Sequence, residues 1–350
     1  MRSFGVHYMT GIKSAENILV IQLRQVGDVL LTTPAIKVLR DHYPHSRISF
    51  LTETGPAALL CGNPHLDAII TRKRRNTFLE DLKLARELRK AKYDLVIDFF
   101  CNPRSAWMSF LTDAPQRIAT YHSGRSWWYT HTPEIKNGTC YAVEDKLALL
   151  RAVGISGELT PPVLMVSEDA THYIDEFFRQ EHLLEQQAGP VITIDPTSRR
   201  QAKRWIPERY VELADRLVER YQAAVIFIWG PEEHDMVTSL VQQGQYPHKL
   251  ACPTDLVQLA ALIQKSDLHI GNCSAPRHIA VAVGTPSLTI MGPTAAVNWT
   301  YPSPLHKAVQ GKVSCLECHK TECKTHDCMK ALTVQEVEKA VEQLLGIIDN

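Results

Sequence analysis

Residues 17–39 constrain the fold more than any other part of this chain. The stretch reads NILVIQLRQVGDVLLTTPAIKVL, where a short apolar, β-branched run leads into a polar turn with one glycine and then into apolar residues at helical spacing. Such a run is typical of a strand buried on both faces of a parallel sheet. The stretch therefore predicts an open α/β sheet whose ligand-facing edge lies where the strand ends.

Asp28 stands at this edge, directly after Gly27. An aspartate at a helix start commonly accepts backbone N–H groups, and on this stretch alone such a capping role is favoured over a catalytic one. The stretch has one glycine and no G-x-G-x-x-G pattern, which argues against a dinucleotide site.

The same alternation of strands and helices continues along the chain. Strands are expected at residues 18–23, 47–52, 68–71, 94–100, 191–195, 224–229, 268–270 and 287–291, and the main helices at 29–39, 77–91, 103–111, 143–153, 207–221, 232–242, 254–265, 275–283 and 333–345. A chain of 350 residues is too long for one ordinary core. We therefore predict two doubly wound α/β domains facing a central cleft, at residues 1–162 and 163–332, followed by a C-terminal helix in 333–350.

Composition narrows the class of protein. Lys and Arg together number 38, as do Asp and Glu, so the chain carries no net charge and nucleic-acid binding is not expected. No apolar run approaches the roughly 20 residues that span a bilayer, and the first residues lack a signal-peptide core. We expect a cytoplasmic protein, peripheral at the inner membrane at most, whose nine cysteines are reduced thiols or metal ligands.

Three polar segments follow strands of the second half, at residues 195–207, 270–280 and 291–294. The first offers two hydroxyls and four cations, which suit a phosphate group at a helix entrance: Thr197, Ser198, Arg199, Arg200, Lys203 and Arg204. A solvated run of charges explains that segment equally well. Taken together, the three segments predict a diphosphate pocket. Glu232, after another strand, would bind a ribose or base, although a surface glutamate is the commoner interpretation.

The first half carries local positive charge. Arg72, Arg74 and Arg75 follow a strand, and Arg104 lies in a later loop. These cations suit a phosphorylated or carboxylated sugar acceptor, with an ordinary solvated surface as the alternative. The aromatic residues 127–131 would pack on sugar rings, dip into a membrane interface or close a domain edge.

Four cysteines fall within 14 residues near the C-terminus: Cys315, Cys318, Cys323 and Cys328. In a reducing compartment this density predicts a structural Zn or Fe site, with His319 or His326 as substitute ligands. The irregular spacing leaves free thiols as an equal alternative.

Three segments resemble the ADP-heptose:lipopolysaccharide heptosyltransferase family: GDVLLTTPAIKVLR at 27–40, the Ser198–Lys203–Trp205–Pro207 spacing, and GNCSAPRHIAVAVGTPSLTIMGPT at 271–294. The resemblance covers nearly the whole chain. It implies a GT-B fold in which the first domain binds acceptor, the second binds nucleotide-sugar, and the last helix returns to brace the first. It also implies inverting transfer without a catalytic metal, with Asp28 as general base. The residues implied in donor binding are Thr197, Ser198, Arg200, Lys203, Glu232, Asn272, Cys273, Ser274, Ala275 and His278.

The resemblance thus implies transfer of heptose from an ADP-sugar to a lipid A-linked core acceptor. One departure bears on the donor. Where the family reads Asn-Asp-Ser-Gly-x-Met-His, this chain has Asn-Cys-Ser-Ala-Pro-Arg-His at 272–278. Cys273 cannot accept two hydrogen bonds as a carboxylate does, and Arg277 adds a cation. A transferase with another nucleotide-sugar, or a non-catalytic nucleotide-sugar-binding or glycan-binding homologue, therefore remains an alternative.

Overall fold

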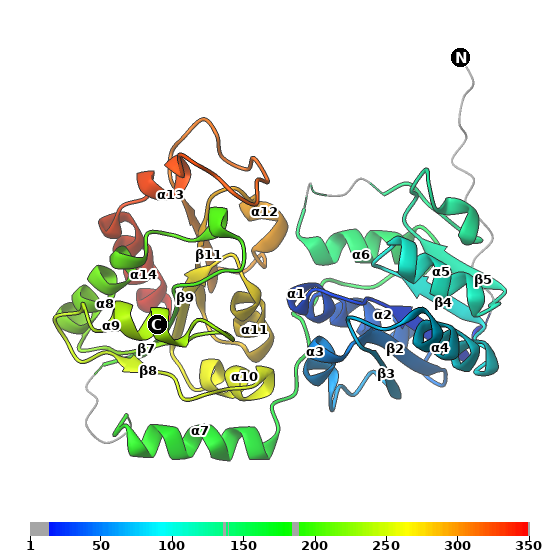
Figure 1. Ribbon diagram of the computed structural model, residues 1–350, viewed down its shortest axis with the longest axis horizontal. Coiled ribbons are helices and arrows are strands. Elements are labelled where there is room, and N and C mark those ends of the chain that lie inside the picture. The colour runs from blue at the N-terminus through cyan, green and yellow to red at the C-terminus, as the bar shows by residue number, and fades with distance from the viewer. Residues whose placement is uncertain (1–13, 136–137, 139, 184–188, 349–350) are drawn as a thin grey trace. The chain divides into compact units, whose positions relative to one another are not determined.

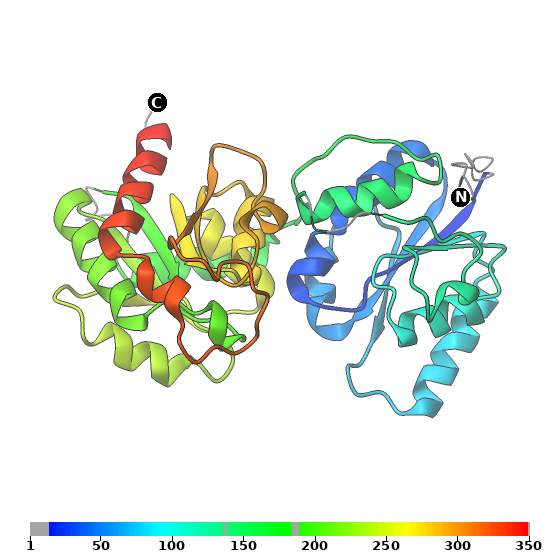
Figure 2. The same cartoon turned by 90° about the horizontal axis from the view of Figure 1, so that it is seen from above.

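The computed structural model describes residues 14–135, 138, 140–183 and 189–348, and its chain divides into two compact units, Met1–Leu164 and Met165–Asn350. Each unit contains one parallel sheet with helices packed on it (Figures 1 and 2). The structure is thus α/β, as the sequence predicts.

The first unit has a five-stranded sheet in the order β3-β2-β1-β4-β5. Its elements are β1 (Asn17–Ile21), α1 (Val26–Leu30), α2 (Thr33–His42), β2 (Arg47–Glu53), α3 (Thr54–Ala57), η1 (Ala58–Leu60), β3 (Ala68–Arg72), α4 (Phe78–Lys90), β4 (Leu95–Asp98), α5 (Pro103–Leu111), β5 (Gln116–Ala119), η2 (Ser126–Trp128) and α6 (Ala142–Arg151).

The second unit has a six-stranded sheet in the order β11-β10-β9-β6-β7-β8. Its elements are α7 (Glu168–Gln180), β6 (Val191–Asp195), η3 (Gln201–Lys203), α8 (Pro207–Tyr221), β7 (Ala224–Phe227), α9 (His234–Val241), β8 (Lys249–Leu250), α10 (Leu256–Gln264), β9 (Leu268–Asn272), α11 (Ala275–Val283), β10 (Ser287–Met291), α12 (Ala296–Trp299), β11 (His306–Gln310), α13 (Asp327–Ala331) and α14 (Val334–Ile348).

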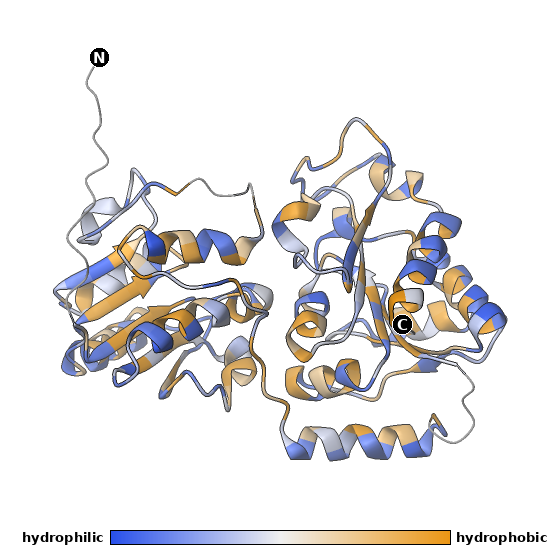
Figure 3. Cartoon of the chain, turned by 180° about the vertical axis from the view of Figure 1, so that it is seen from behind, coloured by the Kyte–Doolittle hydropathy of each residue, from blue (hydrophilic) through white to orange (hydrophobic). Residues whose placement is uncertain are grey.

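In each sheet the strand order reverses direction once. β1 pairs with β2 on one side and β4 on the other, so that Ile18 lies opposite both Ile48 and Leu95. β6 pairs in the same way with β7 and β9. The central strands are strongly hydrophobic because helices cover both faces (Figure 3). The carboxyl ends of β1 and β4, and of β6 and β9, are therefore the expected ligand positions of the two sheets.

The single helix expected at residues 29–39 is two helices. α1 ends at Leu30 and α2 begins at Thr33, with Pro34 in its first turn. A proline ring collides with the carbonyl four residues earlier, which here is that of Leu30, so one continuous helix cannot form. The Thr33 hydroxyl donates instead to the Leu30 carbonyl at 2.7 Å.

The C-terminal helix α14 packs within the second unit. It was expected to return to the first domain, but its buried side chains, including Val337, Val341 and Leu344, join the core of the second unit. They do so because this apolar stripe covers hydrophobic surface of β10, β11 and α8.

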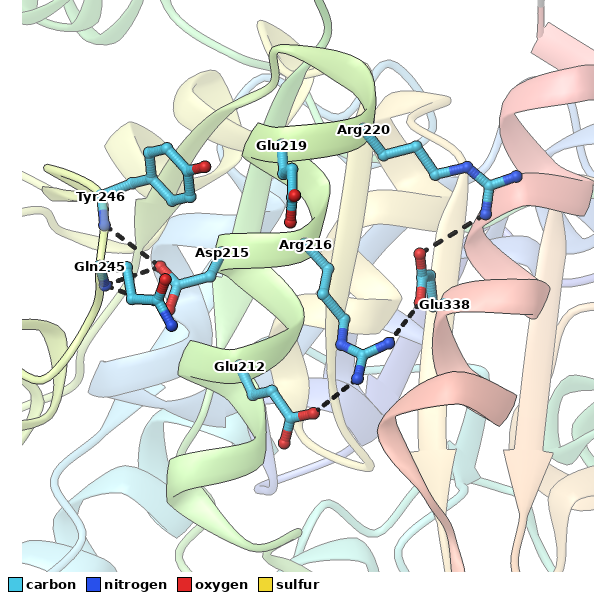
Figure 4. A pocket seen from close by; sticks show the side chains of 8 residues that line it. All are labelled: Glu212, Asp215, Arg216, Glu219, Arg220, Gln245, Tyr246 and Glu338. Carbon is cyan, nitrogen blue, oxygen red and sulfur yellow. Dashed lines mark hydrogen bonds and ion pairs between the residues drawn. The ribbon is translucent and has the colours of Figure 1, made fainter.

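Ion pairs fasten the polar side of α14 to α8. Arg216 contacts Glu212 at 2.9 Å and Glu338 at 3.2 Å, and Arg220 contacts Glu338 at 3.5 Å. These groups line a surface depression together with Asp215, which accepts the backbone N–H groups of Gln245 and Tyr246 (Figure 4). The arginines are paired with carboxylates of the same depression. We therefore interpret the depression as part of the packing between α8 and α14 rather than as a ligand site.

Within the described ranges, no helix combines the length and the apolar character needed to cross a bilayer.

Candidate functional site

The candidate donor site lies where β6 and β9 end. Asp195 closes β6, and Gly271 faces it from the neighbouring strand. A Cβ atom on residue 271 would lie 2.8 Å from the Cβ of Asp195. The glycine therefore lets the two strands approach closely enough for their following loops to share one site.

Asn272 holds the two loops together. Its Oδ1 accepts the backbone N–H of Trp205 at 2.8 Å, and its Nδ2 donates to the Thr197 carbonyl at 3.0 Å. The side chain is fully buried. Asn272, expected as a donor contact, thus acts as a positioning residue that fixes the loop carrying Thr197 and Ser198.

Two carboxylates face each other across the Thr197 hydroxyl. Asp195 Oδ1 lies 3.0 Å from Thr197 Oγ1, and Glu233 Oε2 lies 2.7 Å from the same oxygen. Glu233 also accepts the Gly230 N–H at 2.9 Å, whereas Glu232 is exposed and has a left-handed φ of 70°. Of the two glutamates after Trp229, Glu233 rather than the predicted Glu232 contacts the Thr197 loop, because the turn directs the second carboxylate inward.

Lys203 reaches the other loop. Its Nζ lies 3.3 Å from Cys273 Sγ and 3.4 Å from the Cys273 carbonyl, and 6.0 Å from the ring centre of Trp299. No carboxylate pairs with it in the described part of the chain, and its side chain is partly exposed. Arg204 donates from Nε to the Ser198 carbonyl at 2.6 Å and so supports the same loop, whereas the side chain of Arg200 is exposed to solvent. The amine of Lys203 is accordingly the cation placed to meet a ligand.

Arg277 is buried behind Cys273, with 2% of its surface exposed. Its guanidinium donates to the Trp299 carbonyl and to Thr300 Oγ1, and lies 3.4 Å from Met291 Sδ and 3.9 Å from Cys273 Sγ. Across the described residues it forms no ion pair with a carboxylate. A buried cation without a counter-charge makes its surroundings attractive to an anion.

His278 is neutral at physiological pH. Burial, with the charges of Arg277 and Lys203, holds its pKa well below the usual value. Its Nδ1 is buried without a hydrogen-bond partner in the described structure, and its ring lies 6.0 Å from Trp299. The helix α11 begins beside it at Ala275 with Ser274 as N-cap, so unpaired backbone N–H groups of the first turn add partial positive charge.

The Ser274 hydroxyl is engaged away from its own helix, because it donates to Asp195 Oδ2. Burial raises the pKa of Asp195 to about 6 from an ordinary 3.8, and the Glu233 charge adds to the rise, while the Ser274 and Thr197 bonds oppose it. Asp195 is a site residue that sequence reasoning passed over. Its signal was its position as the last residue of a buried strand directly before the polar loop.

This raised pKa predicts a pH dependence. The folded state favours protonated Asp195, so its stabilising contribution is full below about pH 4 and is lost as pH rises through 6. Asp195→Asn does not titrate. The stability of this variant relative to wild type should rise by on the order of 2–3 kcal/mol between pH 4 and pH 7.5. Urea unfolding followed by tryptophan fluorescence at both pH values measures it; a pH-independent difference would contradict the assignment.

The cysteine-rich tail packs on two loops of this site. The Thr321 carbonyl accepts the Ala202 N–H at 3.2 Å, and His326 Nε2 lies 3.1 Å from the Ala202 carbonyl, next to Lys203. Glu317 donates its N–H to the Gly292 carbonyl at 3.1 Å, after β10. The tail thus braces the η3 turn and the third predicted segment, 291–294.

The four tail cysteines are close enough to influence one another. Burial, reinforced by the charges of the other three thiols, raises the pKa of Cys328, whereas an N–H from His326 at 3.4 Å lowers that of Cys323. Cys315 and Cys318 are exposed. No three Cys, His, Asp or Glu side chains converge as a metal centre in residues 14–135, 138, 140–183 and 189–348. The donor atoms suit a soft metal, but their arrangement as described is not that of a closed site.

In the first unit, Asp28 lies in α1 just past the end of β1, half-buried. Its Oδ2 accepts the Gln25 N–H at 3.4 Å. The capping interpretation therefore holds in a weak form, since the bond is long and the other carboxylate oxygen accepts no hydrogen bond from the residues that the structure describes. Asp28 can cap its helix and still present an oxygen at the sheet edge.

Two further polar groups lie at this edge and were not foreseen. Lys146 of α6 donates to Gln22 Oε1 at 3.2 Å, and its Nζ lies 5.2 Å from the Phe99 ring centre. Burial lowers the pKa of Lys146, opposed by the charges of Asp28, Asp145 and Asp98. The one lysine in the stretch 143–153 directly precedes a run of apolar residues, and this was the available signal.

Asp98 ends β4 and is fully buried, so burial raises its pKa. It accepts the Tyr129 hydroxyl at 2.6 Å and the N–H groups of Phe100 and Cys101 at 3.0 and 2.9 Å. These bonds shape the β4–α5 loop and tie the aromatic segment 127–131 to the sheet edge.

The predicted acceptor arginines divide into two kinds. Arg72 is 1% exposed and binds Asp81 through two nitrogens, at 2.7 and 2.9 Å, so it serves the fold and the acceptor prediction is wrong for it. Arg104 contacts the same carboxylate at 3.4 Å but stays half-exposed. Arg74 and Arg75 are exposed. The Arg72–Asp81 ion pair could not be predicted from the sequence, because nothing in a run of basic residues indicates which side chain is buried.

Comparison with known proteins gives a consistent result. The family profile described as "Glycosyltransferase family 9 (heptosyltransferase)" matches residues 82–329. The chain is similar to "Lipopolysaccharide heptosyltransferase 3" of Escherichia coli (strain K12), at 32% identity over 300 residues that cover 79% of this chain and 83% of the relative.

Two solved structures are also similar. That of the glycosyl transferase family 9 protein from Veillonella parvula DSM 2008 has a TM-score of 0.85 at 24% identity, covering 97% of this chain and 99% of the other. That of E. coli ADP-heptose lps heptosyltransferase II has a TM-score of 0.78 at 22% identity, covering 95% and 100%. These likenesses show a GT-B fold, as the sequence predicts.

Proposed function

Since the chain belongs to glycosyltransferase family 9, the heptosyltransferases, we propose that it transfers a heptose from ADP-heptose to a lipid A-linked lipopolysaccharide core acceptor, with inversion at the anomeric carbon. The assignment as a glycosyltransferase follows from the family. The donor, the acceptor and the stereochemistry are the proposal. The names of two similar proteins, a lipopolysaccharide heptosyltransferase and an ADP-heptose lps heptosyltransferase, support the donor and the class of acceptor.

One observation carries the donor proposal. Lys203, the buried Arg277 and the start of α11 gather positive charge at the switch point of the second sheet, where the sequence also places Ser198 and Ser274. A sugar diphosphate carries negative charge that grows on the leaving group as the glycosidic bond breaks. Fixed cations and backbone N–H groups stabilise that developing charge without having to reorganise.

The proposed reaction needs one base. Asp28 would remove the proton from an acceptor hydroxyl while that oxygen attacks the anomeric carbon, and ADP would leave with its diphosphate bound by Lys203, Ser198 and the first turn of α11. Thr197, in the loop after β6, and Glu233, in the loop after β7, would hold the nucleoside, since the two side chains are hydrogen-bonded to each other and Glu233 also accepts the Gly230 N–H. Neutral His278 would offer its unpaired Nδ1 to a sugar or phosphate oxygen.

The acceptor would be bound through exposed cations of the first unit. We retain Arg74, Arg75 and Arg104 in this role, without Arg72. Anionic core sugars suit guanidinium groups, which form paired hydrogen bonds with phosphate and carboxylate.

A transfer assay tests the proposal. The full chain is incubated with ADP-heptose, and separately with other ADP-sugars, on lipid A–core acceptors, and the product is read by mass spectrometry, with NMR of the anomeric proton for stereochemistry. We expect transfer from ADP-heptose. If only another ADP-sugar reacts, the donor assignment fails. If none reacts while ADP binds, the protein is a nucleotide-sugar-binding homologue.

The same assay on Cys273→Asp addresses the departure at that position. If the carboxylate raises transfer from ADP-heptose over other ADP-sugars, the native thiol has shifted donor preference. Arg277 lies 3.9 Å from the sulfur and would pair with the new carboxylate, so the double variant with Arg277→Met is its control.

No cofactor is needed for this reaction. We propose only a structural role for any Zn or Fe bound by the tail cysteines, because the tail contacts the Lys203 turn through Ala202 rather than the ligand position itself. Metal analysis of the purified chain, compared with Cys315→Ser/Cys318→Ser, checks whether a metal is present.

A further inference from the structure

The first unit exposes a continuous aromatic ridge. Its exposed members are Phe78, Leu79, Phe110 and Trp127, which keep 70%, 75%, 44% and 69% of their surface accessible. Large apolar side chains on a protein surface are unremarkable when scattered, but a contiguous group marks an interaction surface.

Ring distances and helical spacing connect the aromatic residues of this group, and Leu79 adjoins Phe78 in the chain. Phe78, at the start of α4, lies 6.1 Å from Trp107 of α5. Phe110 follows Trp107 by three residues and so lies on the same side of α5. Phe110 in turn lies 6.4 Å from Trp127, which lies 4.8 Å from Trp128. We name Phe78, Leu79, Trp107, Phe110 and Trp127 the aromatic ridge; it crosses α4 and α5, neighbouring helices on the sheet (Figure 1).

Cations flank this ridge. Lys73, Arg74 and Arg75 lie just before α4, all exposed, and none forms an ion pair with a carboxylate in the described portion of the chain. Arg104 lies one turn before Trp107 on α5, with 49% of its side chain exposed.

Of the acidic groups close to the ridge, Asp81 and Asp113 are paired with arginines, whereas Glu80 caps its helix and keeps its charge. Glu80 accepts the Thr77 N–H at 2.7 Å, Asp81 is buried against Arg72, and Asp113 pairs with Arg89 at 2.8 Å. The surface beside the aromatic rings is therefore locally basic, although the whole chain has no net charge.

We propose that the aromatic ridge and its flanking cations form a docking surface for an anionic lipid bilayer. Tryptophan and phenylalanine side chains settle at the level of the lipid headgroups, and lysine and arginine beside them are attracted to negatively charged headgroups. The positive charge beside the aromatic ridge favours a negatively charged bilayer over a neutral one. The proposal rests on the proposed function in one respect, since a lipid-linked acceptor has to be met at a bilayer.

A vesicle-binding experiment tests the proposal. The full chain is sedimented with two kinds of vesicle. One contains phosphatidylcholine alone, and the other contains phosphatidylcholine with about 30 mol% phosphatidylglycerol. We expect binding to the anionic vesicles and much weaker binding to the neutral ones. Phe78→Ser/Trp127→Ser should weaken binding at least about tenfold, and Lys73→Gln/Arg74→Gln should weaken it about fivefold per charge at low salt.

A matched control variant is Met236→Ser/Ile347→Ser, which removes two exposed apolar side chains, 44% and 37% accessible, from the second unit. It should bind vesicles like wild type. Equal binding by the Phe78→Ser/Trp127→Ser variant and wild type, or no binding by wild type, would overturn the proposal. Loss of self-association in light scattering, without any vesicle binding, would assign the ridge to a second copy of the chain and also overturn it.

The test separates this proposal from the proposed function. The Phe78→Ser/Trp127→Ser variant should bind ADP unchanged and should transfer to a delipidated, water-soluble acceptor at the wild-type rate. If no transfer occurs with any acceptor, the proposed function fails while the vesicle result still decides the docking surface. If transfer to the soluble acceptor falls with vesicle binding intact, the ridge binds acceptor sugars and the docking proposal is wrong.

Discussion

Asp28→Asn should lower the turnover of heptose transfer by about 10²- to 10⁴-fold, which is the usual contribution of a positioned general base. The amide cannot take a proton from the acceptor hydroxyl, whereas its oxygen can still accept the Gln25 N–H that Asp28 accepts at 3.4 Å. The substitution therefore removes the base and keeps the helix start.

The measurement is a steady-state transfer assay with saturating donor and acceptor, paired with calorimetric titration of ADP. We expect ADP affinity within about twofold of wild type, because Asp28 belongs to the first unit and the cations proposed to bind diphosphate belong to the second. Asp28→Glu is the matched control: it retains a carboxylate, so it should keep more activity than Asn. Wild-type turnover in Asp28→Asn would remove Asp28 from the reaction.

The same residue illustrates how far sequence reasoning reaches. Strand, polar turn and helix placed Asp28 at the sheet edge from the local pattern alone, because the apolar run of β1 and the polar residues that follow it are both local properties. The helix begins at Val26, so the expected glycine turn at Gly27 is the first turn of α1. The choice between cap and base could not be made locally, since one carboxylate has two oxygens and can serve both roles.

The sequence did not indicate which polar side chains are buried or which distant residues they contact. Arg72 and Arg74 look alike in a basic run, but only Arg72 turns into the protein to meet Asp81, nine residues on. Arg277 likewise shows no sequence sign of being buried, because its partners, the Trp299 carbonyl and Met291 sulfur, come from another helix and strand.

Elements at the sheet edges were missed for a different reason. β5 (QRIA) and β11 (HKAVQ) are short and partly exposed, so they lack the apolar run that marks a central strand. α7 was passed over although Ser167 caps it and Ala170, Ile174, Phe177 and Phe178 follow helical spacing. The helical spacing of α7 was therefore present in the sequence, but the polar residues between the apolar positions obscured it.

Lys203→Met should weaken ADP binding by about 10- to 100-fold and leave adenosine binding within about twofold of wild type. A hydrogen bond from a charged donor to phosphate typically contributes about 1.5–3 kcal/mol to the binding free energy. Adenosine has no phosphate, so its binding does not depend on this hydrogen bond. Methionine preserves the length and apolar stem of the side chain beside Trp299, so the substitution removes mainly the charge.

Arg200→Met is the matched control for this variant, because it removes a cation from the same loop whose side chain is exposed to solvent. It should change ADP affinity by less than about threefold, through screened long-range attraction alone. Calorimetry of ADP and adenosine on wild type and both variants supplies the comparison. Equal losses for the two ligands in Lys203→Met, or equal losses of ADP affinity in both variants, would place Lys203 outside the phosphate site.

The reaction gives a second readout of the same charge. If Lys203 neutralises the departing diphosphate, its loss should lower turnover by about 10²- to 10³-fold even at saturating donor, as for other groups that stabilise a developing negative charge. Buried Arg277 would remain, and its unpaired charge explains why binding should be weakened rather than abolished. A variant that binds ADP weakly yet turns over at the wild-type rate would show that Lys203 serves ground-state binding alone. Leaving-group stabilisation would then rest on Arg277 and on the first turn of α11.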